Sequence, residues 1–145
     1  MTTKPIGPTA HGAIDYAFAT LNTLAPTLFG LTGPARAICY SFAASQGLLN
    51  ALTDHPLGLK KVVPLRVHGE LETPYVPAIL LLPWVTGALK QRNARLYFSA
   101  FFAIAAANYL LTDYNAYEPE APLPTGQRPL AWAEAALSGD AGRVA

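Results

Sequence analysis

Long stretches without charged residues constrain the fold of this chain more than any other feature of its sequence. Four such stretches, of 20, 17, 17 and 17 residues, cover Tyr16–Ala35, Ala37–Thr53, Thr73–Leu89 and Leu96–Thr112. A helix of 17 residues is about 25 Å long, slightly less than the ~30 Å of a bilayer's hydrocarbon core. The stretches therefore predict four short transmembrane helices.

The composition supports the same interpretation. Charged residues make up 13% of the 145 residues, about half of the ~25% usual in soluble domains, and hydrophobic residues make up 52%. The segment 101–107 (FFAIAAA) lacks the polar stripe of a helix that faces water. We predict an all-α fold, an integral membrane four-helix bundle; the alternative is a water-soluble helical bundle. The expected helices lie near residues 12–31, 36–53, 70–89 and 95–112.

The net charge and the single cysteine exclude several classes of protein. A net charge of +1 does not attract nucleic acid, so we expect no nucleic-acid partner. Cys39 alone forms neither an intramolecular disulfide nor a cysteine-based zinc site. After Tyr114 the sequence becomes rich in proline, which predicts a domain over residues 1–115 and a tail over 116–145, with a short helix near 130–137.

The chain also contains an internal repeat. His11–Asp15 (HGAID) matches His68–Glu72 (HGELE) at an offset of 57 residues, and Leu52–Asp54 (LTD) matches Leu111–Asp113 at an offset of 59. The repeats cover about residues 5–58 and 62–115. Because each unit contains two spans, both copies start on the same side of the membrane and form parallel repeats.

These motifs resemble the SPW-repeat membrane proteins, small bacterial proteins built from a two-helix unit with a Ser-Pro-Trp motif near the end of its first helix. The likeness covers about residues 4–115 and rests on Lys4-Pro5, His11-Gly12, Asp15-Tyr16, Leu52–Asp54, Leu57–Leu59, Pro64 and His68. The Ser-Pro-Trp motif itself reads Ala25-Pro26-Thr27 in the first unit and Leu82-Pro83-Trp84 in the second. The resemblance implies a multi-pass protein of the bacterial cytoplasmic (inner) membrane and transfers no catalytic residue. We place both termini in the cytoplasm.

Two histidine–acid pairs are the candidate functional residues. His11 with Asp15 and His68 with Glu72 are spaced i, i+4, so each pair shares one helix face. One interpretation is a site in which the two histidines bind haem b as axial ligands, or in which all four residues hold a divalent metal or pass protons. The interpretation that we favour at this stage is capping and anchoring at helix ends, with no metal ligand assigned. The polar face comprises Asp15, Asp54, Glu72 and Asp113.

No reaction is identified by the sequence. It contains no nucleophile beside a base, no phosphate-binding glycine loop and no Cys/His cluster at metal spacing. We therefore expect no enzyme, no catalytic residue and no cofactor, but a small accessory or structural subunit of a larger respiratory or photosynthetic membrane complex. Its expected partners are the lipid bilayer and other membrane subunits. The alternatives are a haem- or metal-binding membrane redox protein that uses His11 and His68, and a small transporter whose helices are interrupted at prolines.

Overall fold

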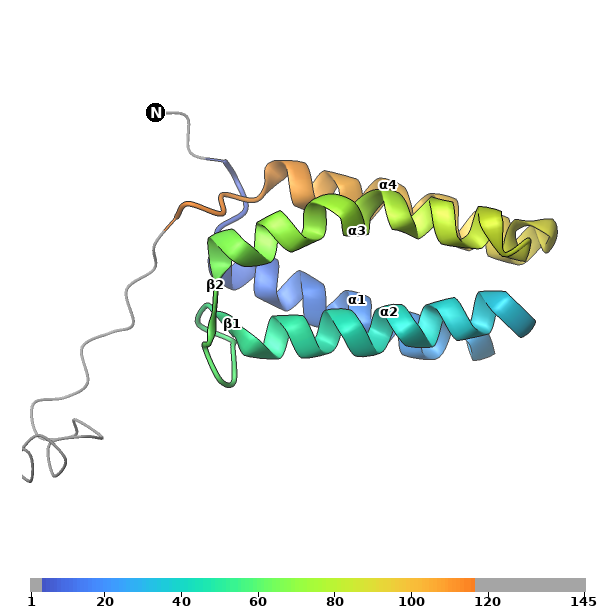
Figure 1. Cartoon of the computed structure of the whole chain (residues 1–145), viewed down its shortest axis with the longest axis horizontal. Helices are drawn as coiled ribbons and strands as arrows, with labels where there is room; N and C mark the ends of the chain where they lie inside the picture. Colours follow the sequence, from blue (N-terminus) through green and yellow to red (C-terminus); the bar gives the residue numbers. More distant parts are fainter. Residues whose placement is uncertain (1–3, 117–145) are drawn as a thin grey trace, which may run out of the picture.

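Four helices form an elongated bundle in the computed structural model, which describes residues 4–116 (Figure 1). They are α1 (Pro8–Leu28), α2 (Gly33–Leu52), α3 (Leu65–Val85) and α4 (Arg92–Leu111), with a short 3-10 helix η1 (Ala88–Lys90) before α4. The all-α prediction is confirmed. The predicted tail over residues 116–145, including its short helix, lies outside the described residues except for residue 116.

The helices begin earlier than the charge-free stretches suggest. Pro8 and Pro34 lie in the first turns of α1 and α2, where the missing proline N–H costs no hydrogen bond. In consequence each histidine lies at the end of the first helical turn and each acid lies one turn further into the helix. His11 and His68 are the fourth residues of α1 and α3, and the helices continue for several turns beyond them.

Short turns join the helices of each hairpin. Gly30, Gly33 and Gly87 have positive φ angles of 62°, 52° and 73°, a conformation that glycine adopts without a Cβ penalty. Gly87 ends α3 and leads through η1 into α4. These turns leave α1 packed along α2 and α3 packed along α4 (Figure 1).

Aromatic side chains fill the middle of the bundle. Phe18 of α1 meets Phe101 of α4 edge-to-face, with ring centroids 5.2 Å apart, and Phe101 stacks on Tyr97 at 5.9 Å. The buried Tyr97 hydroxyl donates a hydrogen bond of 2.9 Å to the side-chain oxygen of Asn22 on α1. This core joins the two hairpins and fixes the separation of α1 from α4.

Two short parallel pairings close the end of the bundle opposite the hairpin turns. β1 (Thr53–Asp54) pairs with β2 (Val63–Pro64), so Thr53 lies opposite Val63. A matching isolated bridge joins Ile6 to Thr112. The pairings hold the residue after α2 beside the start of α3 and the residue after α4 beside the start of α1.

The prediction of a multi-pass inner-membrane protein with cytoplasmic termini is wrong. Within residues 4–116, one helix, Arg92–Leu111, is long and apolar enough to cross a membrane, with a mean hydropathy of 1.3 and 33% of its apolar window buried. The charge-free stretches hid the cause. Uncharged Gln46 and Asn50 lie within α2, and α3 begins eight residues before its charge-free stretch and so includes Arg66, His68, Glu70 and Glu72. These polar and charged residues lower the hydropathy of the two helices below that of a membrane span.

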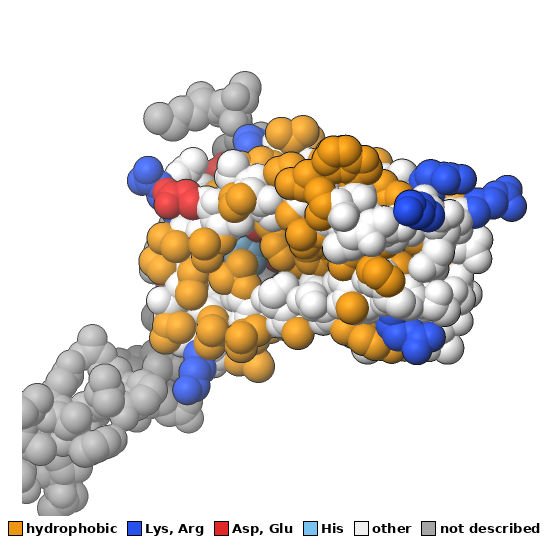
Figure 2. Space-filling model, turned by 45° about the vertical axis from the view of Figure 1, so that its right-hand side comes forward, with side chains coloured by type: hydrophobic (Ala, Val, Ile, Leu, Met, Phe, Trp, Pro, Cys, Tyr) orange, Lys and Arg blue, Asp and Glu red, His pale blue; other side chains and the backbone are white. Residues whose placement is uncertain are grey.

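Apolar and charged side chains separate on the surface. Figure 2 shows apolar side chains over much of the visible face and charged side chains at its two ends, with Lys and Arg alone at the right-hand end and Asp and Glu beside Lys and Arg at the left-hand end. Leu28, Trp84, Leu96 and Leu110 are among the exposed apolar residues. The buried polar residues gather instead at the opposite end of the bundle, where the candidate site lies.

Candidate metal centre

The two histidine–acid pairs meet inside the bundle. His11 and Asp15 come from α1, and His68 and Glu72 come from α3, at the fourth and eighth positions of each helix. His11, Asp15 and His68 are 0% exposed, and Glu72 is 7% exposed. One donor atom from each of the four residues lies within 4.8 Å of the others. In the sequence analysis we considered a shared site for these four residues but favoured capping and anchoring at helix ends.

The distances within the cluster fall in a narrow range. The two histidine Nε2 atoms are 3.3 Å apart. Asp15 Oδ2 lies 3.3 Å from His11 Nε2 and 3.1 Å from His68 Nε2. Glu72 Oε2 lies 3.6 Å from His11 Nε2, and its Oε1 lies 3.6 Å from His68 Nε2. The four side chains therefore converge on one point.

A threonine fixes the orientation of each imidazole. The Thr53 hydroxyl donates to Leu49 O at 2.7 Å and accepts from His68 Nδ1 at 2.7 Å. The Thr112 hydroxyl donates to Asn108 O at 2.7 Å and lies 3.0 Å from His11 Nδ1, which the Asn108 amide nitrogen Nδ2 also contacts at 3.2 Å. These contacts at Nδ1 turn the Nε2 atom of each imidazole into the cluster, and a neutral His68 with its proton on Nδ1 presents the Nε2 lone pair there.

Amide side chains hold the other oxygen of Asp15. Gln46 Nε2 of α2 and Asn108 Nδ2 of α4 each donate to Asp15 Oδ1 at 3.5 Å. Asp15 Oδ2 is buried and makes no hydrogen bond of good geometry with any described residue, although it faces both imidazoles. A buried carboxylate oxygen is costly without compensation, so this position favours a positive charge at the point of convergence, either a cation or a proton on an imidazole.

Charge within the cluster shifts the pKa values of its members. Burial raises the pKa of Asp15, but the neighbouring His11 and His68 outweigh burial and lower it below 3.8 overall. Burial lowers the pKa of His68, but contacts with Asp15 and Glu72 outweigh it and raise the pKa to about 9. The site therefore favours anionic carboxylates together with a positive charge.

Two aromatic rings cover the cluster. The His55 ring packs over Gly12, and the Tyr114 ring packs over Gly69, where a Cβ atom would lie 2.7 Å from the ring. Tyr114 meets His11 edge-to-face at 5.2 Å, and its hydroxyl donates a hydrogen bond to Glu72 Oε2. Burial and then the Glu72 carboxylate raise the pKa of Tyr114, so its phenol remains a donor.

Sequence reasoning did not assign these supporting residues. His55 and Tyr114 are each the residue after a Leu-Thr-Asp motif, and Thr53 and Thr112 are the threonines of the two motifs. The repeat was the available signal, since it placed a threonine and a ring at matching positions in both halves.

The predicted polar face divides into two groups. Asp15 and Glu72 belong to the buried cluster. Asp54 is exposed, and Asp113 accepts a hydrogen bond from the Asn115 backbone at 3.1 Å, so neither joins the cluster. The capping interpretation is wrong for both helices, because neither α1 nor α3 has an acidic residue in its first turn.

The cluster does not fit haem b. Axial ligands of one haem iron lie on opposite faces of the porphyrin. Here His11 Nε2 and His68 Nε2 are only 3.3 Å apart, and the Asp15 carboxylate lies against both. No gap remains for the macrocycle between these side chains.

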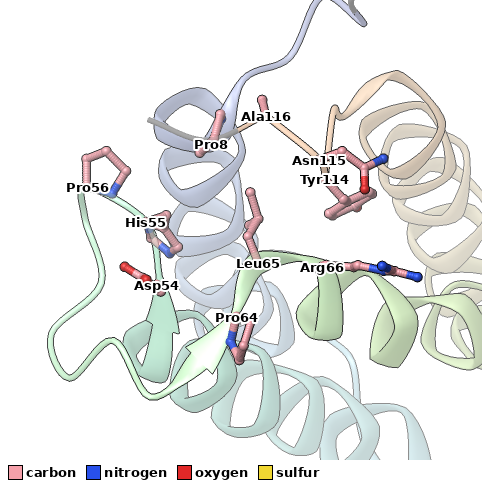
Figure 3. Close-up of a pocket in the computed structure, with 10 residues that line it drawn as sticks. All are labelled: Pro8, Asp54, His55, Pro56, Pro64, Leu65, Arg66, Tyr114, Asn115 and Ala116. Atoms are coloured by element: carbon pink, nitrogen blue, oxygen red, sulfur yellow. The ribbon is translucent and has the colours of Figure 1, made fainter. Parts of the chain in front are cut away.

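A cavity of about 300 Å³ lies next to the covering rings (Figure 3). Its lining includes Arg66, Tyr114 and Asn115 on one side and Asp54 and His55 on the other (Figure 3). Tyr114 is therefore in contact with both the cavity and the buried cluster.

Comparisons of the chain with known protein families, with curated proteins and with solved structures found no match.

Proposed function

We propose that this protein binds one divalent metal ion through His11, Asp15, His68 and Glu72. The observation that carries the proposal is the spacing of the donor atoms. An ion held at about 2.0–2.2 Å by four tetrahedral ligands separates those ligands by about 3.3–3.6 Å. The five separations that involve the two histidines run from 3.1 to 3.6 Å, with Glu72 Oε2 facing His11 and Oε1 facing His68, and one donor atom from each of the four residues lies within 4.8 Å of the others.

The donor set favours zinc among the common ions. Two imidazole nitrogens and two carboxylate oxygens in a tetrahedral arrangement suit Zn²⁺, whereas Mg²⁺ and Ca²⁺ prefer six or more oxygen ligands. Two carboxylates also balance the charge of the ion. Thr53 and Thr112 provide the hydrogen bonds that orient ligating histidines in known metal sites.

The alternative is an ion-pair network in which protons take the place of the metal. It explains the raised pKa of His68. It gives no hydrogen-bonding partner of good geometry to Asp15 Oδ2 within the described residues, although that atom is fully buried. A metal ion supplies that partner, because an oxygen–metal contact does not depend on the direction of an N–H bond.

The test is the stoichiometry of metal bound by the purified protein. Chelator-treated protein is dialysed against Zn²⁺, and the bound metal is measured by mass spectrometry. We expect one ion per chain in the wild type and a large loss of affinity in His68→Ala. Asn22→Ala is the matched control, because Asn22 is also a fully buried polar residue of α1 but is hydrogen-bonded to Tyr97 and not to the cluster. If the wild-type protein binds no stoichiometric zinc, the proposed metal site is wrong and the cluster is the ion-pair network.

A second candidate function is that of a subunit that packs on a larger protein assembly. Leu81, Trp84 and Val85 are 52%, 69% and 61% exposed and lie at i, i+3 and i+4 on α3, so they share one face. A contiguous exposed apolar surface of this kind marks an interaction site. We expect a Leu81→Gln/Trp84→Gln variant to dissociate from any co-purifying assembly, whereas Leu59→Gln, on the exposed loop, does not.

The parallel repeat and the likeness to the SPW-repeat proteins remain part of the proposal. Matching contacts support the repeat: a histidine of each unit binds the threonine of the other unit, and a ring of each unit covers its own glycine. The arrangement makes one site from two copies of the same two-helix unit.

A further inference from the structure

Glu72 differs from the other three residues of the proposed metal site. The side chains of His11, Asp15 and His68 are fully buried, whereas 9% of the Glu72 side chain is exposed. Both Glu72 contacts with histidine are 3.6 Å, longer than the 3.1 and 3.3 Å of Asp15. Glu72 is therefore the most accessible and the least closely held ligand.

Tyr114 gives Glu72 a partner outside the metal site. Its hydroxyl donates to Glu72 Oε2, and its ring lies against His11 on the side of the cavity. A carboxylate that leaves the ion remains hydrogen-bonded to this phenol. The other acid, Asp15, has no comparable route, because it lies between two imidazoles and two amides.

The cavity offers space and donors for a small anion beside Tyr114, the hydrogen-bond partner of Glu72, although Glu72 itself does not line it. Its volume of about 300 Å³ is larger than the volume of an anion of a few heavy atoms. Arg66 and Asn115 lie on the same side of it as Tyr114 (Figure 3), and both also line a second cavity of about 410 Å³ beside Tyr109. The Arg66 side chain is 77% exposed. Among the ion pairs of the described residues, it takes part in one, with the 64% exposed side chain of Glu70.

We propose that Glu72 is an exchangeable ligand and that a small oxyanion from the cavity takes its place on the metal. The inference rests on the proposed metal site and adds its ligand class. Catalytic zinc sites keep three protein ligands and one exchangeable position, and here His11, Asp15 and His68 are the three. In the exchange the Glu72 carboxylate leaves the ion, stays with the Tyr114 hydroxyl, and the anion binds through one oxygen.

The test uses the full chain loaded with Co²⁺, whose visible spectrum reports its coordination, and titrates it with acetate. We expect a saturable spectral change with acetate and none with perchlorate at the same ionic strength. In Glu72→Gln, measured at saturating Co²⁺, we expect acetate to bind at least about tenfold more tightly, because the neutral amide does not repel the anion. Glu72→Asp is a second variant. Its shorter side chain holds the carboxylate farther from the ion, so we again expect tighter acetate binding than in the wild type.

The outcomes separate the two proposals. A tetrahedral Co²⁺ spectrum that acetate leaves unchanged in the wild type and in both variants overturns the exchangeable position but retains the metal site. Protein that binds no Co²⁺ and no Zn²⁺ overturns both. If the acetate concentration that gives half of the spectral change is the same in the wild type and in both variants, acetate does not replace Glu72. That result overturns the proposal that Glu72 is the exchangeable ligand.

Discussion

Removing the hydroxyl group that orients either histidine tests the proposed metal centre without touching a ligand. Thr53→Val and Thr112→Val keep the shape of the side chain but delete the oxygen that is hydrogen-bonded to Nδ1 of His68 or His11. Both threonines are fully buried, so water does not replace the lost partner.

Two independent considerations give the magnitude. Mutation of the groups that orient ligating histidines costs about 10- to 100-fold in metal affinity, which equals about 1.4–2.8 kcal/mol. Leaving a buried donor unpaired costs about 1–3 kcal/mol, the same range. We expect the larger loss in Thr53→Val, because its contact with His68 is 2.7 Å and that of Thr112 with His11 is 3.0 Å.

Competition with a chromophoric chelator measures the zinc dissociation constant, and circular dichroism checks that each variant is folded. Thr23→Val is the matched control. The Thr23 hydroxyl also donates to the carbonyl four residues earlier, Ala19 O at 2.9 Å, but it is exposed and far along α1 from the cluster. Folded Thr53→Val and Thr112→Val proteins with wild-type zinc affinity would refute the reasoning.

Two further predictions concern the metal-free protein. The pKa of His68 is raised to about 9, so protonated His68 stabilises the fold fully below about pH 6.5, and this contribution is lost as the pH rises through 9. The pKa of Asp15 is lowered, so its carboxylate stabilises the fold above about pH 3.8. Denaturation of chelator-treated protein should therefore show an unfolding free energy that falls between about pH 6.5 and 9; a rise over that interval contradicts the charge assignment. Gly69→Ala forces a methyl group to within 2.7 Å of the Tyr114 ring and should destabilise the fold by about 1–3 kcal/mol in the same assay. Gly47→Ala, whose added methyl lies at an ordinary 3.5 Å from Ala19, is the control, and equal effects of the two changes would count against the packing of Tyr114.

The helices and the histidine–acid pairs were within reach of sequence reasoning. Stretches without charge predicted four helices, and the i, i+4 spacing placed each histidine and its acid on one face. Asn50 and Asn108 join helices directly, since they donate to Gly12 O at 2.9 Å and to Asp15 Oδ1 at 3.5 Å.

The position of the pairs inside the bundle was not predicted, for a physical reason. Helix ends were placed where charges begin, which puts a histidine or an acid at the boundary by construction. Pro8 and Leu65 instead start α1 and α3 three residues before the histidines, and the pairings of Ile6 with Thr112 and of Thr53 with Val63 cover them. The charge-free stretches also hid the buried amides of α2 and left out the charged first turns of α3, and for that reason the membrane prediction failed.

The contacts between the two repeat units could not be predicted from the sequence. His11 binds Thr112, which is 101 residues away, and His68 binds Thr53, which is 15 residues away. Spacing along the chain does not predict the first of these contacts, because it depends on how the second hairpin packs against the first.

X-ray absorption spectroscopy at the zinc edge, on protein loaded with one Zn²⁺ per chain, tests the central claim most directly. The account predicts four nitrogen and oxygen ligands at about 2.0–2.2 Å with the outer-shell scattering of two imidazoles, and loss of one imidazole in His68→Ala. A six-coordinate oxygen shell without imidazole scattering, or a spectrum that His68→Ala leaves unchanged, would contradict it.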